Sequence, residues 1–240
     1  MSEAVDAFRT RLSEQYLAGI GLADPFLYFG GEPVRPVPPQ EVATGGVLIL
    51  GAYPTAHFEM HDEQVTPVRN IERPLAEDTV SGKTLHAHYF KPLGLAREKC
   101  WVTNLVKMFL FKEGHQLAPG AKLPSLLKRK SFDAVGMSEA NLAFLDEELQ
   151  LADPKLVITL GIEVAGVLRG KKTLKDRNAL LSGQLASFTL KDRSYNAIHL
   201  VHPGILLRRT GGTRNPWPHA HETQHLPAAR EVLRQLRLLD

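Results

Sequence analysis

The stretch VLILGAYP, residues 47–54, decides the class of fold, because an apolar run closes in Gly51 and is followed by a loop that contains a proline. Three similar runs come later in the chain: WVTNLV at residues 101–106, LVITLG at residues 156–161 and AIHLVH at residues 197–202. Short apolar runs that are bounded by turn residues are typical of strands buried on both faces. The four runs therefore predict four interior strands.

Segments with helical spacing separate these runs and follow the last one. They span residues 81–93, 138–151, 163–169 and 222–238, and a weaker helical pattern spans residues 4–16 outside the core. Ser138 is placed to cap the second of these helices. Alternating strands and helices, without internal repeats, predict an α/β fold in one domain, residues 1–240. We expect a three-layer α/β/α sandwich with a central four-stranded parallel sheet.

Composition narrows the class of protein. Among 240 residues, 43% are hydrophobic and 23% are charged, which excludes a disordered chain. The single cysteine, Cys100, excludes an internal disulfide and any site built only from thiolates. No apolar run is long enough to span a membrane, and residues 1–19 are charged and amphipathic, so we expect a cytoplasmic protein without a membrane partner. A net charge of +3 permits a polyanionic partner.

The segments that follow the four strands are the candidates for a binding site, because ligands of open α/β sheets bind at the carboxyl edge. These segments are GAYPTAHF at residues 51–58, TNLVK at residues 103–107, GIEVAG at residues 161–166 and HPGILLRR at residues 202–209. An amide such as that of Asn104 offers both a donor and an acceptor, which suits the Watson–Crick edge of a base. An asparagine at a strand end can also simply cap a turn.

The order and spacing of these four motifs resemble the uracil-DNA glycosylase superfamily, over residues 47–209. Its members carry a glycine-x-x-proline loop after the first strand, an asparagine after the second and a His-Pro loop with arginine after the fourth. The chain is most similar to the bacterial iron–sulfur branches, in GLAREKCWVTNLVK at residues 94–107 and in HPGILLRR. The resemblance implies a DNA glycosylase of base excision repair that hydrolyses the N-glycosidic bond of a deaminated base such as uracil. It also implies DNA as partner and a monomeric enzyme.

The resemblance assigns roles to individual residues. Asn104 would read the base, and His202 would stabilise the negative charge on the departing base. The base pocket would be shaped by Gly51, Ala52, Pro54 and Phe58. Contacts with DNA are expected from Lys107, Arg208, Arg209 and Arg214. The alternative for His202 is a His-Pro turn whose ring satisfies a backbone carbonyl.

The first loop departs from the family pattern. Well-studied branches place an acidic residue or an asparagine there to hold the attacking water, whereas this chain has Ala52 and Tyr53 at those positions. Tyr53 is therefore a candidate through its hydroxyl or its ring. His57 and His61, with Glu59 and Asp62 beside them, are the further candidates for general-base work. An exposed loop without a catalytic role is the alternative for both histidines.

Two further departures concern the cofactor and the stacking residue. Met108 stands where the iron–sulfur branches have a cysteine, so we expect no cofactor. Leu75 stands where a base-stacking aromatic is expected, and Phe58 or Tyr53 can take over that contact. Histidines two positions apart on a helix point to different faces, so the sets His86/His88 and His219/His221/His225 predict no metal site.

Two other functions remain open from the sequence. The missing first-loop acid is compatible with a protein of the same fold that binds nucleic acid or a modified base without hydrolysing it. The glycine-proline loop is also compatible with an α/β enzyme that acts on free nucleotides or nucleosides.

Overall fold

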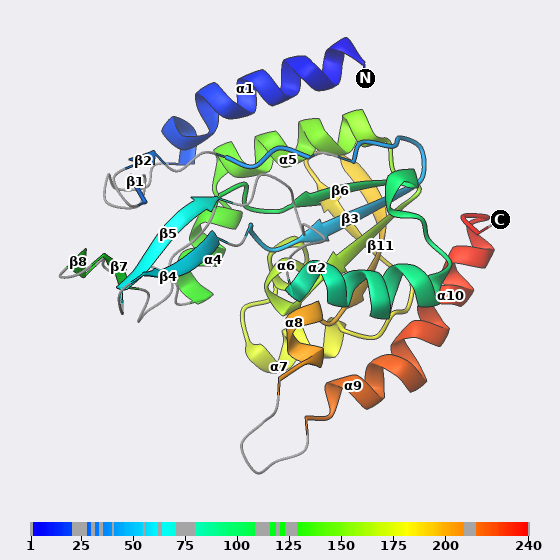
Figure 1. Ribbon diagram of the computed structural model, residues 1–240. Helices are drawn as coiled ribbons and strands as arrows, with labels where there is room; N and C mark the ends of the chain where they lie inside the picture. The colour runs from blue at the N-terminus through cyan, green and yellow to red at the C-terminus, as the bar shows by residue number, and fades with distance from the viewer. Residues whose placement is uncertain are drawn as a thin grey trace.

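A computed structural model of the chain describes residues 2–20, 28–29, 32–33, 36–39, 41–54, 56–61, 64–70, 80–108, 116–118, 121–122, 129–208 and 215–239. Its centre is a five-stranded sheet flanked by helices on both faces (Figure 1). The strand order is β10-β11-β9-β3-β6. The strands are β3 (Val47–Gly51), β6 (Cys100–Asn104), β9 (Leu156–Leu160), β10 (Ala186–Leu190) and β11 (Arg193–Leu200).

Four of these strands are parallel and coincide with the four predicted runs, which confirms that part of the prediction. The fifth strand, β10, was not predicted, and it pairs antiparallel with β11 at the edge of the sheet. Its side chains alternate, with Phe188 and Leu190 buried and Ser187 and Thr189 exposed. Such half-exposed alternation is typical of antiparallel edge strands and differs from the continuous apolar runs of the interior.

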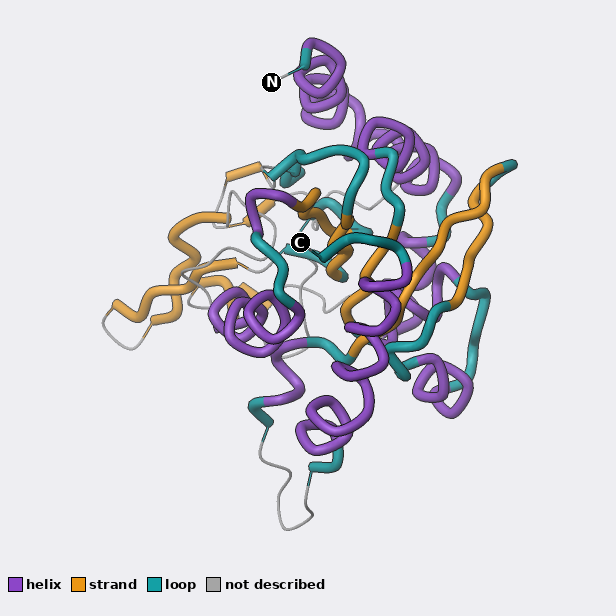
Figure 2. Tube along the Cα trace, turned by 90° about the vertical axis from the view of Figure 1, so that its right-hand side faces the viewer, coloured by secondary structure: helices purple, strands orange, loops and turns teal. Residues whose placement is uncertain are grey.

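Helices cover both faces of the sheet, as expected for a sandwich (Figure 2). One face is covered by α4 (Arg129–Gly136), α5 (Glu139–Ala152) and α6 (Ile162–Leu168), with α1 (Glu3–Ile20) outside α5. The other face is covered by α2 (Val80–Leu85), η2 (His86–Phe90), α3 (Lys91–Leu93) and α10 (Leu226–Gln235). These elements confirm the predicted helices, and Ser138 caps α5 by accepting a hydrogen bond from the backbone nitrogen of Asn141.

The remaining elements are short. They comprise η3 (Arg97–Lys99), α7 (Leu174–Leu180), α8 (Pro203–Leu206), α9 (Trp217–Ala220), η4 (His221–His225), and the two-stranded ribbons β1 (Tyr28–Phe29) with β2 (Glu32–Pro33), β4 (Ala56–His61) with β5 (Gln64–Asn70), and β7 (Gln116–Ala118) with β8 (Ala121–Lys122). No helix in the described part of the chain is long and apolar enough to cross a membrane.

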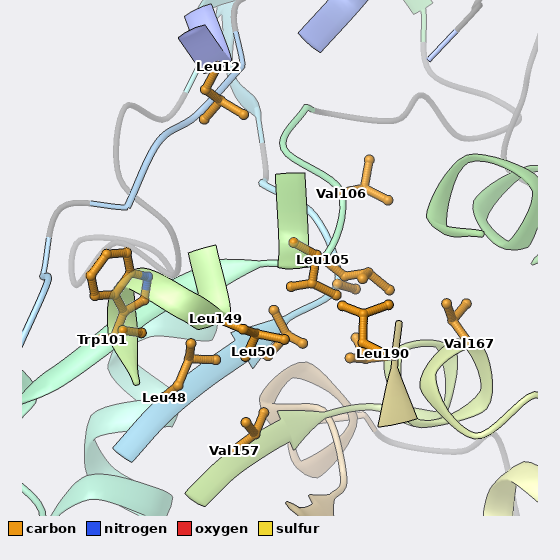
Figure 3. Packing of buried hydrophobic residues seen from close by; sticks show 14 of the residues in the cluster. Leu12, Leu48, Leu50, Trp101, Leu105, Val106, Leu149, Val157, Val167 and Leu190 are labelled. Atoms are coloured by element: carbon orange, nitrogen blue, oxygen red, sulfur yellow. The ribbon is translucent and has the colours of Figure 1, made fainter. Parts of the chain in front are cut away.

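Alternate residues of each strand enter two hydrophobic cores. Leu48 and Leu50 pack with α5 and α6 on one face (Figure 3), whereas Val47 and Ile49 pack with η2 and α10 on the other. Continuous burial of both faces explains why the strands read as uninterrupted apolar runs. Burial of this apolar surface is the main source of stability in such a sandwich.

The connections between the strands create a crevice at the carboxyl edge. From β3 the chain crosses to β6 on one side, and from β9 it crosses to β11 on the other side. The direction of winding therefore changes between β3 and β9, which is the point where open α/β sheets bind their ligands. The loops at residues 52–54 and 161–163 border this point.

Candidate active site

Asn104, the last residue of β6, is fully buried at the carboxyl edge of the sheet. The turn that follows it is held against the first loop, because the backbone nitrogens of Leu105 and Val106 donate to the carbonyls of Gly51 and Ala52 at 2.8 and 2.9 Å. Among the described residues, neither Oδ1 nor Nδ2 of Asn104 has a hydrogen-bond partner. An unpaired buried amide costs about 1–3 kcal/mol for each polar group, so it calls for a functional explanation.

The backbone around Asn104 is fixed by a buried lysine. Lys107 donates from Nζ to the Asn104 carbonyl and to Thr103 Oγ1, both at 2.6 Å, and it forms a salt bridge with Glu148 on α5. Burial lowers the pKa of Lys107, and the Glu148 carboxylate opposes that shift. The side chain is 0% exposed, so the prediction that Lys107 contacts DNA phosphate is wrong. A lysine after a strand can point into the core when a carboxylate that is distant along the chain neutralises it there.

His202 begins the short helix α8 directly after β11. Its Nδ1 accepts a hydrogen bond from the backbone nitrogen of Gly204 at 3.1 Å. A ring nitrogen that accepts a hydrogen bond carries no proton, so in the neutral ring the proton lies on Nε2. His202 is partly buried at the carboxyl edge, and Nε2–H is the donor of its neutral ring.

Two side chains, Tyr89 and Asn215, hold the His202 loop through hydrogen bonds. Tyr89 on η2 donates from its hydroxyl to the Val201 carbonyl at 2.5 Å, and burial raises the pKa of Tyr89, so it remains a neutral donor. Asn215 donates to the carbonyls of Ile205 and Arg208 at 2.8 and 3.1 Å. The Tyr89 ring in turn packs on the ring of His221. Tyr89 could not be predicted as a partner from the sequence, because it lies 112 residues from Val201.

The first loop supplies a wall of the crevice and no acidic group. Gly51, Ala52 and Pro54 are buried, and Tyr53 is partly buried against Phe132 with ring centroids 6.0 Å apart. Burial raises the pKa of Tyr53 to about 12, with the nearby Glu163 carboxylate adding to the shift and Arg208 opposing it. The phenol is therefore neutral at physiological pH and cannot act as a general base.

Glu163 was not among the predicted site residues, although it lies in the strand-end segment GIEVAG. A methyl group placed on Gly161 would lie 3.2 Å from Glu163 Oε2 and 3.3 Å from His202 Cβ. Gly161 has a φ of +103°, a conformation that favours glycine, and it leaves no room for a side chain between these two residues. The carboxylate thus lies on the same side of Gly161 as His202, and its charge also acts on Tyr53.

Several predicted residues lie outside this geometry. His57, Phe58 and His61 are on β4, whose backbone alone is described. Arg209 and Arg214 lie outside the described residues, as do Asp62 and Leu75. Arg208 is described and exposed, next to Leu207, whose side chain is 50% exposed.

The comparison with known families agrees with this arrangement. A family model of the uracil DNA glycosylase superfamily matches residues 39–226. The chain belongs to this superfamily. All four strand-end segments lie inside the matched residues, whereas α1 lies before them. A comparison with curated proteins finds no match.

The buried histidines and the cysteine of this uracil-DNA glycosylase superfamily member are the remaining groups that could bind a metal. The Nε2 atom of His221 lies 2.9 Å from the His88 carbonyl oxygen. The ring of His221 packs edge-on against the ring of His225. In the part of the chain that the structure describes, no three His, Cys, Asp or Glu side chains gather as metal ligands would. Cys100 is buried, and burial raises the pKa of its thiol to about 12, so the thiol stays protonated.

Proposed function

We propose that the protein is a DNA glycosylase that hydrolyses the N-glycosidic bond of a deaminated base, such as uracil, in DNA. The observation that supports this most directly is the fully buried amide of Asn104, whose donor and acceptor have no partner among the described residues. Uracil presents an N–H beside a carbonyl oxygen, and one amide can pair with both. A base extruded from the helix would thus satisfy groups that are otherwise unpaired.

The tautomer of His202 supports the same reaction. Breaking the glycosidic bond leaves the electron pair on the base, so negative charge develops on a base carbonyl oxygen. Because Nδ1 of His202 accepts from the Gly204 backbone, Nε2 is the nitrogen that donates. A fixed donor at the place where charge develops lowers the barrier more than it strengthens ground-state binding.

Contacts with the DNA strand are assigned to the fourth loop. Arg208 is exposed there and can neutralise a phosphate, and Arg209 and Arg214 are proposed to do the same. Leu207 is half-exposed beside Arg208, and apolar side chains at such positions can wedge between bases. One chain carries all four loops, so we expect a monomer that acts on DNA in the cytoplasm.

A second candidate function keeps the fold and the DNA but not the hydrolysis. It is favoured by one observation: Ala52 and a neutral Tyr53 occupy the described part of the first loop, and neither of them can act as a general base. Such a protein would bind a damaged base and retain it.

Single-turnover assays distinguish these functions. Wild-type protein in excess is incubated with end-labelled single- and double-stranded oligonucleotides that contain uracil, hypoxanthine or xanthine, and alkali reveals the abasic product. For a glycosylase, wild-type protein excises at least one base, and His202→Ala loses excision while it still binds the oligonucleotide. Folded wild-type protein that binds DNA but excises none of these bases would favour the binding protein. Strong competition by a free mononucleotide would instead indicate an enzyme of nucleotides.

A further inference from the structure

Hydrolysis of a glycosidic bond requires a water molecule that is held and deprotonated on the side of the sugar opposite the departing base. Residues 51–54, the described part of the first loop, provide no group for this step, since Ala52 is apolar and the Tyr53 hydroxyl remains protonated. Among the described residues, we therefore look for this group at the other strand ends.

Glu163 is the carboxylate at that position. The described segments that directly follow the parallel strands are residues 51–54, 105–108, 161–164 and 201–204, and within them Glu163 is the only aspartate or glutamate. It lies in the first turn of α6, after β9, at the change of winding between β3 and β9. It thus follows the strand next to the one that carries the incomplete first loop.

The environment of Glu163 suits a group that acts on water. The side chain is partly buried, and its Oε2 and His202 Cβ lie 3.2 and 3.3 Å from the same point above Gly161. Within the described part of the chain, no salt bridge or hydrogen bond engages the carboxylate. The charge of Glu163 also acts on Tyr53, whose pKa it helps to raise.

We propose that Glu163 is the catalytic residue that orients and deprotonates the attacking water, in place of a first-loop acid. This inference rests on the proposed glycosylase function. The water oxygen bonds to C1′ of deoxyribose while the bond from C1′ to the base nitrogen breaks and leaves its electron pair on the base. The water proton passes to a carboxylate oxygen of Glu163 and then to solvent or to the released base. The products are an abasic site and the free base.

The structure offers another role for a carboxylate in this place. An acidic residue in the first turn of a helix interacts favourably with the helix dipole whether or not it takes part in catalysis. Glu139 likewise lies in the first turn of a helix, α5, where it is exposed and does not directly follow a strand. Glu139→Gln is therefore a matched control for Glu163→Gln.

The test uses an oligonucleotide that contains the base excised by the wild type. It measures the rate of single-turnover excision and the Kd for the oligonucleotide. We expect Glu163→Gln to slow excision by a factor of about 10²–10⁴ with an unchanged Kd, and Glu139→Gln to match the wild type. Wild-type excision by folded Glu163→Gln, while His202→Ala is inactive, would overturn the role of Glu163 and leave the glycosylase function standing. If the wild type excises no base, the glycosylase function fails and this inference fails with it.

A second variant covers the case in which Glu163→Gln does not fold. Glu163→Asp keeps the negative charge in the first turn of α6 but withdraws the carboxylate by one methylene group. Slower excision with an unchanged Kd would support Glu163 as a general base, because general-base catalysis requires the carboxylate to lie within hydrogen-bond distance of the water. Excision at the wild-type rate by both Glu163→Asp and Glu139→Gln would contradict the catalytic role of Glu163.

Discussion

The Nζ atom of Lys107 donates a hydrogen bond to the backbone carbonyl of Asn104 at 2.6 Å, while the same ammonium forms a salt bridge with the buried Glu148. A cation buried in the core thereby fixes the backbone of the residue to which we assign base recognition. The arrangement extends to α1, because the backbone nitrogen of Lys107 donates to the Tyr16 hydroxyl at 2.9 Å. The helix that precedes the family match thus supports the site.

Glu148→Gln is expected to lower the free energy of unfolding by about 3–5 kcal/mol, because it leaves the Lys107 ammonium buried without its counter-charge. Glu148 also accepts from Trp101 Nε1 at 2.9 Å, a bond that glutamine can retain, so the loss reports mainly on charge. Urea denaturation measures it. The double variant Lys107→Met with Glu148→Leu removes both charges, so its free energy of unfolding should fall by less than that of Glu148→Gln. A double variant as unstable as Glu148→Gln would contradict this explanation.

The salt dependence of DNA binding should separate the two cations that were predicted to contact DNA. Arg208 is exposed, and each phosphate contact contributes about 0.7–0.9 to the slope of log K against log salt. Arg208→Ala is therefore expected to reduce the slope by about that amount. The Lys107→Met, Glu148→Leu variant should keep the wild-type slope, because the lysine it removes is 0% exposed. Equal slopes for the wild type and Arg208→Ala would remove Arg208 from the DNA contacts.

Gly161→Ala is expected to slow excision by a factor of about 100 or more, since a new methyl group would press on both Glu163 and His202. Gly170 provides the control, because its φ is also positive, at +60°, but no atom lies within 4 Å of an added methyl group. Gly170→Ala should cost stability of about 1 kcal/mol from backbone strain without changing the rate. Similar rates for the two variants would show that the contact above Gly161 does not matter.

Acid should destabilise the fold through its buried histidines. Burial lowers the pKa of His199 from 6.5 to about 4, with Arg169 adding to the shift. Between these values the unfolded state binds a proton that the folded state does not, so the stability present above pH 6.5 falls as the pH decreases toward 4. The contribution of His199 is about 3 kcal/mol.

Urea midpoints at pH 7 and pH 4 test this linkage. His199→Gln cannot titrate, yet it can still reach Thr159, whose hydroxyl lies 2.7 Å from His199 Nδ1. The variant should therefore lose less stability on acidification than the wild type. His221 and His225, whose pKa values burial also lowers, account for the dependence that remains. An identical loss in the wild type and in His199→Gln would contradict the assignment.

The interior of the fold could be predicted because its strands are buried on both faces. Leu48 to Leu50 and Val157 to Leu160 lie in short, nearly continuous apolar runs, which are typical of strands buried on both faces. Glycine or polar residues end each run. β10 escaped prediction because only Phe188 and Leu190 enter the core, which is too little signal for a five-residue edge strand. Its pairing with β11 is visible only in the structure.

The site could be predicted in part for the same reason. Asn104 ends an interior strand and His202 closely follows another, so their place at the carboxyl edge depends only on the order of the strands. The direction of Lys107 could not be predicted, because its partner Glu148 is 41 residues away on α5. The placement of Glu163 and His202 around Gly161 likewise could not be predicted, because the positive φ of Gly161 leaves no pattern in the sequence.

The most direct test of the central claim is single-turnover excision by Asn104→Ala, with Asn196→Ala as control, since Asn196 is an exposed asparagine on β11. If Asn104 reads the extruded base, Asn104→Ala should lose excision by a factor of about 100 or more while its circular dichroism and melting curve remain those of a folded protein. Asn196→Ala should retain the wild-type rate. Undiminished excision by folded Asn104→Ala would contradict the claim that this buried amide recognises the base.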